Sequence, residues 1–134
     1  MMPFVLDASV ALSWALPDES NLLADRVKER LTVERAITPS IFWYELRNVL
    51  TICERKGRIH ADDTTRFLES LASLPISPRG EPDERVVMRL VRERALTVYD
   101  AAYLALAKSE CVPLATLDRA LEAAARTEGV EIVA

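Results

Sequence analysis

Four acidic residues that lie far apart in the sequence have the types and surroundings that could do chemistry. They are Asp7, Glu45, Asp100 and Asp118. No Cys/His cluster with zinc spacing accompanies them, because His60 is the single histidine and the two cysteines are isolated. Sites made only of oxygen ligands suit Mg²⁺ or Mn²⁺. Such ions assist phosphodiester hydrolysis by activating water and neutralising charge on the phosphate, so the acids predict a hydrolase of that kind.

Three of these acids also have an ordinary structural explanation. Asp7 and Asp118 each stand where an apolar run gives way to a helical pattern, a place where aspartate commonly serves as a turn or capping residue. Thr97 and Asp100 match a capping box, in which the Asp100 carboxylate reaches back to the Thr97 amide. Taken alone, any one of the three is better explained as a cap than as a catalytic acid.

Glu45 is harder to explain as a structural residue. It lies in an otherwise apolar helical stretch, residues 41–46, and shares a predicted helix face with Ile41, Asn48, Val49 and Ile52. A carboxylate on a face that turns inward destabilises the fold unless it is paired or coordinated. A bound cation is the simplest partner. The alternative is that Glu45 lies at the edge of the apolar stripe and pairs with Arg47 or another surface base.

The elements that must position these acids alternate along the chain. Apolar runs predict short strands at 4–6, 36–38, 74–76, 112–115 and 130–133, and helices at 10–16, 20–31, 41–56, 62–74, 82–94, 98–110 and 119–127. Ser9, Ser20 and Thr97 are predicted N-caps, and Gly57 is the predicted residue after a helix end. This pattern predicts an α/β domain with a mainly parallel central sheet. Ligands bind beyond the carboxyl ends of such strands, where Asp7 and Asp118 fall.

The bulk properties bound the class of protein. The chain has 134 residues, half of them apolar, and no linker or repeat, so we expect a single domain over 1–134. A net charge of −4 argues against a broad basic surface that coats nucleic acid, but not against an enzyme that touches a short stretch of RNA. We find no targeting signal or membrane-spanning run, and we expect Cys53 and Cys111 to be buried free thiols of a cytoplasmic protein.

Aromatic and basic residues offer further candidates. Phe42, Trp43 and Tyr44 could stack on an RNA base, but consecutive residues cannot all face one way, so core and dimer packing explains them better. Two basic groups could bind phosphate or simply form solvated helix faces. They are Arg55, Lys56 and Arg58, and Arg85, Arg89 and Arg92.

Four segments together resemble the ordered motifs of PIN-domain nucleases, and most of all the VapC toxins of bacterial and archaeal toxin–antitoxin pairs. They are LDAS at 6–9, ELRNVL at 45–50, LTVYDAAYLALA at 96–107 and LATLD at 114–118. The resemblance covers essentially the whole chain, and residues 99–107 are its most specific part. By position, Asp7, Glu45, Asp100 and Asp118 match the metal-binding acids of the family. Ser9 and Thr116 match its small hydroxyl positions.

The resemblance implies a fold and a function. It implies a three-layer α/β/α sandwich, dependence on Mg²⁺ or Mn²⁺, endoribonuclease activity on an RNA substrate, a homodimer and an inhibitory VapB-type antitoxin. In this hypothesis Asp7, Asp100 and Asp118 hold one or two ions, and Glu45 is a further ligand or the base that orients water.

Two other functions remain as alternatives. An Asp-nucleophile phosphotransfer domain, similar to haloacid dehalogenases, would use Asp7 directly. Such enzymes usually carry a second aspartate two residues later and a late lysine, whereas Ser9 holds that position here and Lys108 is the only late lysine. The second alternative is a PIN-like scaffold that binds a partner without cutting, and the intact acids argue against it.

Overall fold

The computed structural model describes residues 2–134 and is built around a parallel sheet of four short strands. The strands are β1 (Phe4–Leu6), β2 (Ala36–Thr38), β3 (Ile76–Pro78) and β4 (Leu114–Ala115), in the order β3-β2-β1-β4. Val5 pairs with Ile37 on one side and with Leu114 on the other. Every residue of β1 and β2 is buried, as a parallel sheet covered on both faces requires.

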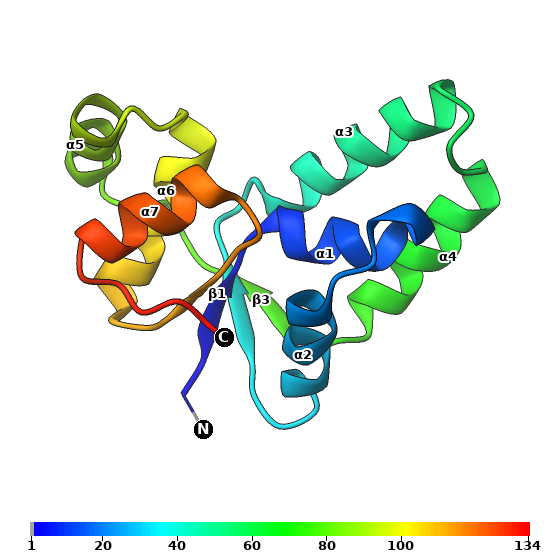
Figure 1. The fold of residues 1–134 in the computed structure, drawn as a ribbon, viewed down its shortest axis with the longest axis horizontal. Coiled ribbons are helices and arrows are strands. Elements are labelled where there is room, and N and C mark those ends of the chain that lie inside the picture. The colour runs from blue at the N-terminus through cyan, green and yellow to red at the C-terminus, as the bar shows by residue number, and fades with distance from the viewer. Residues whose placement is uncertain (1) are drawn as a thin grey trace.

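Helices cover both faces of this sheet. They are α1 (Ala8–Ala15), α2 (Leu22–Arg30), α3 (Phe42–Arg55), α4 (Ala61–Ala72), α5 (Glu84–Arg94), α6 (Val98–Glu110) and α7 (Arg119–Thr127), with a short 3₁₀ turn η1 (Pro17–Glu19). In Figure 1, α1 to α4 lie on one side of the strands and α5 to α7 on the other. The predicted α/β/α sandwich with a parallel sheet is therefore confirmed.

Helix α6 is the most deeply buried helix and forms the centre of its layer. All residues from Ala101 to Ala107 are buried, and Tyr103 is the largest fully buried side chain among them. The alanines let the helix approach the sheet closely, and α6 contacts β1, β4, α5 and α7. Asp100 stands in the first turn of this helix, so a rigid element positions it.

The last predicted strand is wrong. Residues 130–133 form only an isolated parallel bridge, between Leu114 and Ile132. Strand β3 also starts later than predicted, at Ile76, because Pro75 has no N–H and contributes only its carbonyl, which accepts from the Ala36 amide at 2.9 Å.

Helix ends were predicted with mixed success. Thr97 caps α6 and Gly57 follows α3 with a φ of +74°, both as predicted. Asn21 rather than Ser20 caps α2, because its Oδ1 accepts from the Ala24 amide. Ser9 is inside α1, whose N-cap is Asp7, so its predicted capping role is wrong.

A buried carboxylate ties α5, α6 and α7 together. The Glu128 side chain is 5% exposed and forms ion pairs with Arg89, Arg94 and Lys108 at 3.0, 2.6 and 3.0 Å. The hydrogen bond from Arg89 is the main reason that the pKa of Glu128 is lowered, to about 2. Arg89 is therefore engaged in holding the fold, and not a free phosphate-binding cation.

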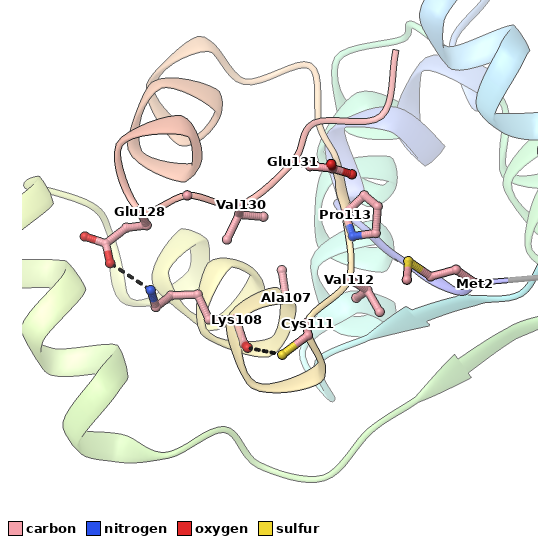
Figure 2. Close-up of a pocket in the computed structure, with 10 residues that line it drawn as sticks. Met2, Ala107, Lys108, Cys111, Val112, Pro113, Glu128, Val130 and Glu131 are labelled. Carbon is pink, nitrogen blue, oxygen red and sulfur yellow. Dashed lines mark hydrogen bonds and ion pairs between the residues drawn. The ribbon is translucent and has the colours of Figure 1, made fainter.

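The Glu128 cluster borders a hollow of about 470 Å³ at the amino-terminal edge of the sheet. Figure 2 shows Lys108 and Glu128 paired at one side of this hollow, with Met2 and Pro113 at the other. Met2 precedes β1 and Pro113 precedes β4, so this edge is opposite to the one that carries Asp7 and Thr116. The hollow is thus remote from the candidate acids.

Both cysteines are free, but only Cys53 is buried. The prediction of two buried thiols is wrong for Cys111, which ends α6 at the surface with a positive φ of 55°. Within the described part of the chain, no helix combines the length and the apolar character needed to cross a membrane.

Candidate active site

Two neighbouring parallel strands bring the first site residues together. Leu6 of β1 pairs with Ala115 of β4, so Asp7 and Thr116, the next residue of each strand, emerge side by side at the carboxyl edge. The Asp7 amide donates to the Ala115 carbonyl at 3.0 Å, which fixes this register. Residues separated by more than a hundred positions meet because parallel strands align their ends.

Asp7 is buried and held by two hydroxyl groups. Its Oδ2 accepts from Ser9 Oγ at 2.6 Å and from Thr116 Oγ1 at 2.7 Å. The same hydroxyls accept from backbone amides, Ser9 from Leu117 and Thr116 from Asp118, each at 3.0 Å. The structure thus places Ser9 and Thr116 against Asp7, where they fix the orientation of its carboxylate.

Tyr103 positions Glu45 from the opposite layer. Its hydroxyl donates to Glu45 Oε1 at 2.7 Å. Burial raises the pKa of Glu45, with further contributions from Asp7 and Asp100, and burial together with Glu45 raises the pKa of Tyr103. A protonated phenol beside a carboxylate is a stable donor, so this bond joins α3 to α6 across the site.

The alternative for Glu45 placed it at the edge of the apolar stripe, paired with Arg47 or another surface base. The placement is confirmed and the partner is wrong. The buried face of α3 carries Phe42 and Leu46, and Glu45 lies at the edge of that face. Glu45 pairs with Tyr103, whereas the guanidinium of Arg47 lies over the Tyr44 ring, 5.7 Å from its centroid. The expectation that the Glu45 face of α3 turns into the core is wrong, because its member Ile52 is 37% exposed.

The capping interpretation separates Asp100 from Asp118. Thr97 Oγ1 accepts from the Asp100 amide at 3.1 Å, but in the part of the chain described the Asp100 carboxylate makes no return bond to Thr97. Asp118 does cap α7, because its Oδ1 accepts from the Leu121 amide at 2.9 Å. The predicted capping box is therefore wrong, and the Asp100 carboxylate is not used by the helix.

The four carboxylates share one electrostatic neighbourhood. The pKa of Asp100 is raised to about 6 by burial first, and then by Asp7 and Asp118. Burial also raises the pKa of Asp7, with a further contribution from Asp118. No ion pair within residues 2–134 involves any of the four acids. The result is a concentration of negative charge at the carboxyl edge of the sheet, which attracts cations.

The donor set fits a hard divalent cation, although the pocket is not a closed coordination shell. Among residues 2–134, no three His, Cys, Asp or Glu side chains are arranged to hold one ion together. Mg²⁺ keeps several waters and needs only one or two direct carboxylates, so a closed shell is not required. Oxygen donors with no competing sulfur or imidazole favour Mg²⁺ or Mn²⁺.

Tyr103 is the functional candidate that the sequence analysis missed. It lies three residues after Asp100 on α6, and therefore on a nearby part of the helix surface. A tyrosine three residues after a candidate acid on the same helix is the sequence pattern that could have indicated a role for Tyr103. Its burial in an alanine-rich helix makes it look like a core residue, which explains why it was overlooked.

Comparisons with known proteins agree with this fold. The family model of the PIN domain matches residues 4–127. The chain belongs to the PIN-domain family. It is 32% identical over 124 residues to ribonuclease VapC3 of Pyrobaculum aerophilum, covering 90% of this chain and 92% of that protein.

Solved structures share the architecture. The crystal structure of PAE2754 from Pyrobaculum aerophilum matches with a TM-score of 0.77 and 27% identity, over 98% of this chain and 84% of that one. FitAcB from Neisseria gonorrhoeae matches with a TM-score of 0.67 and 20% identity, over 98% and 96% of the two chains. VapC20 of Mycobacterium tuberculosis, a toxin that cleaves the sarcin-ricin loop, matches with a TM-score of 0.58 and 15% identity, over 90% and 94%. At these identities the last two support the fold alone.

Proposed function

We propose that this protein is a metal-dependent endoribonuclease, the toxin of a VapBC-type toxin–antitoxin pair, which hydrolyses RNA at Asp7, Glu45, Asp100 and Asp118. One observation carries the proposal. Carboxylates from four separate elements are linked through their effects on one another's pKa, and within residues 2–134 none of them forms an ion pair. The ribonuclease name of the relative from Pyrobaculum aerophilum supports the same substrate class.

In this proposal Asp7, Asp100 and Asp118 hold Mg²⁺ or Mn²⁺. The bound ion supplies activation of water and neutralisation of charge on the scissile phosphate. Ser9 and Thr116 keep the Asp7 carboxylate in one orientation, and Tyr103 does the same for Glu45. The raised pKa of Glu45 suits a group that orients the attacking water and accepts its proton.

The two alternatives are less well supported. For phosphotransfer, the late lysine Lys108 is not available, because it pairs with Glu128. That pair borders the hollow at the amino-terminal edge of the sheet, opposite to the edge that carries Asp7. For a non-cutting scaffold, four unneutralised acids are an unfavourable arrangement without a purpose. A homodimer, a VapB-type antitoxin and a cytoplasmic location belong to the proposal through the family resemblance.

The test is to incubate purified, antitoxin-free protein with total cellular RNA, in millimolar Mn²⁺ or in chelator, and to map new 5′ ends. Discrete ends that form in Mn²⁺ and not in chelator are the expected result. Ends that form equally in chelator would refute metal dependence. No ends in either condition, while the protein still binds the RNA, would favour the scaffold.

A further inference from the structure

We propose that a groove between α1 and α3, next to the acids, is the subsite for one unpaired nucleobase of the RNA substrate. This inference rests on the proposed ribonuclease function and adds the place where the substrate is recognised. The groove has a volume of about 310 Å³, at the lower end of the range for pockets that hold small molecules.

The groove begins one hydrogen bond from the Asp7 carboxylate. Ser9 and Leu117 line it, and they are joined because Ser9 Oγ accepts from the Leu117 amide at 3.0 Å. The same Ser9 hydroxyl donates to Asp7 Oδ2 at 2.6 Å. A phosphate held at the acids therefore leaves the adjoining nucleotide within reach of this groove.

Helix α3 carries the groove and the site on one face. Val49 lines the groove and lies one helical turn after Glu45. Ile41, one turn before Glu45, lines a different hollow on the other side of the acids. The face of α3 that was expected to enter the core therefore runs along the substrate path.

The chemistry of the lining suits a base. Leu12, Leu16 and Val49 give the groove an apolar lining against which a base can pack. Asn21 at the end of the groove uses its Oδ1 to accept from the Ala24 amide, which leaves its NH₂ group as a donor for a base edge. Arg58 holds Asp18 through two bonds of 3.0 Å, so that carboxylate is neutralised next to the groove. Unpaired RNA bases are recognised by such stacking and edge contacts.

The hollow on the other side of the acids is a poorer candidate for RNA. It has about 390 Å³ and includes the exposed ring of Tyr99, but Glu81 and Glu84 also line it. Two carboxylates repel a phosphodiester chain, and no arginine or lysine lines that hollow. The groove beside Ser9 contains one acid, Glu19, and one arginine, Arg58.

The experiment uses the RNA oligonucleotide that carries the mapped cleavage site and a series in which one nucleotide at a time is abasic. For the wild-type protein, we expect kcat/KM to fall about tenfold or more at one abasic position beside the cleaved bond. Val49→Trp fills the groove and should lower kcat/KM on the intact RNA by a similar factor, with no further loss on that abasic RNA. Ile52→Trp, on α3 outside the groove, is the matched control and should behave like wild type.

The outcomes separate this inference from the proposed function. Equal cleavage of every abasic RNA overturns the subsite, whatever the variants do, and leaves the groove to a protein ligand while the ribonuclease activity stands. The inference is also overturned if Val49→Trp cleaves RNA and its kcat/KM falls at the abasic position by the same factor as that of the wild type. If wild type cleaves no RNA in Mn²⁺, the proposed function and this inference fall together. Should Val49→Trp not fold, the abasic series on wild type decides alone.

Discussion

Asp7 and Glu128 are both withdrawn from solvent, yet their pKa values shift in opposite directions. The Glu128 side chain is 5% exposed and Asp7 is 4% exposed. Three cations surround Glu128 and lower its pKa to about 2, whereas burial first and then Asp118 raise the pKa of Asp7, against the hydrogen bonds from two hydroxyls that lower it. At Glu128 the hydrogen bonds from the cations outweigh the effect of burial, whereas no cation among residues 2–134 pairs with Asp7 and burial prevails there.

In the proposed function this difference separates a structural carboxylate from a catalytic one. The Glu128 cluster satisfies its charge internally and joins α5, α6 and α7. Asp7 accepts two hydrogen bonds but pairs with no cation among residues 2–134, which costs stability in the folded protein and makes this edge of the sheet receptive to a cation.

The largest effect is expected from Asp100→Asn. Asparagine preserves the shape of the side chain and the hydrogen bond from the backbone amide of residue 100 to Thr97 Oγ1. It removes the negative charge that a divalent ion needs. RNA cleavage should fall by at least about a hundredfold, with unchanged circular dichroism. Asp62→Asn, an exposed change in the first turn of α4, is the control and should cleave normally. Wild-type cleavage by Asp100→Asn would mean that Asp100 is only a residue of the helix end.

The next largest effect is expected from Glu128→Gln, on stability. The change leaves Arg89, Arg94 and Lys108 close together without their shared carboxylate, so Tm should fall by roughly 5 °C or more. Glu122→Gln removes a single long pair, of 3.9 Å with Arg126, and should hardly move Tm. Cleavage at a permissive temperature should be retained by both. An unchanged Tm for Glu128→Gln would show that the cluster contributes little.

The sequence predicts those features of the fold and of the two carboxylate sites that depend on local signals. Apolar runs and caps such as Thr97 and Gly57 indicated the elements, and the combination of four acids with the resemblance to PIN-domain nucleases indicated the candidate site. The contact of Ser9 with Leu117 joins residues far apart in the chain, and so does the bond from Tyr103 to Glu45. Such tertiary contacts leave no periodic pattern in the sequence.

The Glu128 cluster shows the same limit more clearly. Arg89 had the spacing of a solvated helix face or a phosphate site, and nothing near it in the sequence indicated Glu128 as its partner. The failed strand at 130–133 has a similar cause. Its apolar alternation is genuine, but strand pairing there is reduced to one bridge between Leu114 and Ile132.

A smaller effect is expected in the dependence of stability on pH. The pKa of Asp100 rises from 3.8 to about 6 in the folded protein, so the folded state binds more protons than the unfolded chain between these values. Stability from this group is therefore fully present below about 3.8 and is lost as pH rises through about 6. Melting curves in chelator from pH 4 to 7 should show Tm falling more steeply for wild type than for Asp100→Asn. Parallel curves would show that the pKa of Asp100 is not raised in the folded protein.

The smallest effect is expected from the metal, and it tests whether the acids act as one site. In chelator near neutral pH, the repulsion among Asp7, Asp100 and Asp118 exists only in the folded state, because the unfolded chain separates them. Asp118→Asn keeps the cap on Leu121, since asparagine caps about as well as aspartate, and it removes part of the repulsion. Its Tm in chelator should therefore lie a few degrees above that of wild type.

Millimolar Mn²⁺ should reverse that order. The ion binds only the assembled site, so it should raise the Tm of wild type and have less effect on Asp118→Asn. Glu128→Gln carries its change in the other cluster, and its Tm should respond to Mn²⁺ as that of wild type does. If wild type and Asp118→Asn melt together in chelator and Mn²⁺ shifts neither, the carboxylates do not form a shared site. The carboxylates of Asp7 and Glu128 would then differ only in the groups that surround them, and that difference would have no bearing on function.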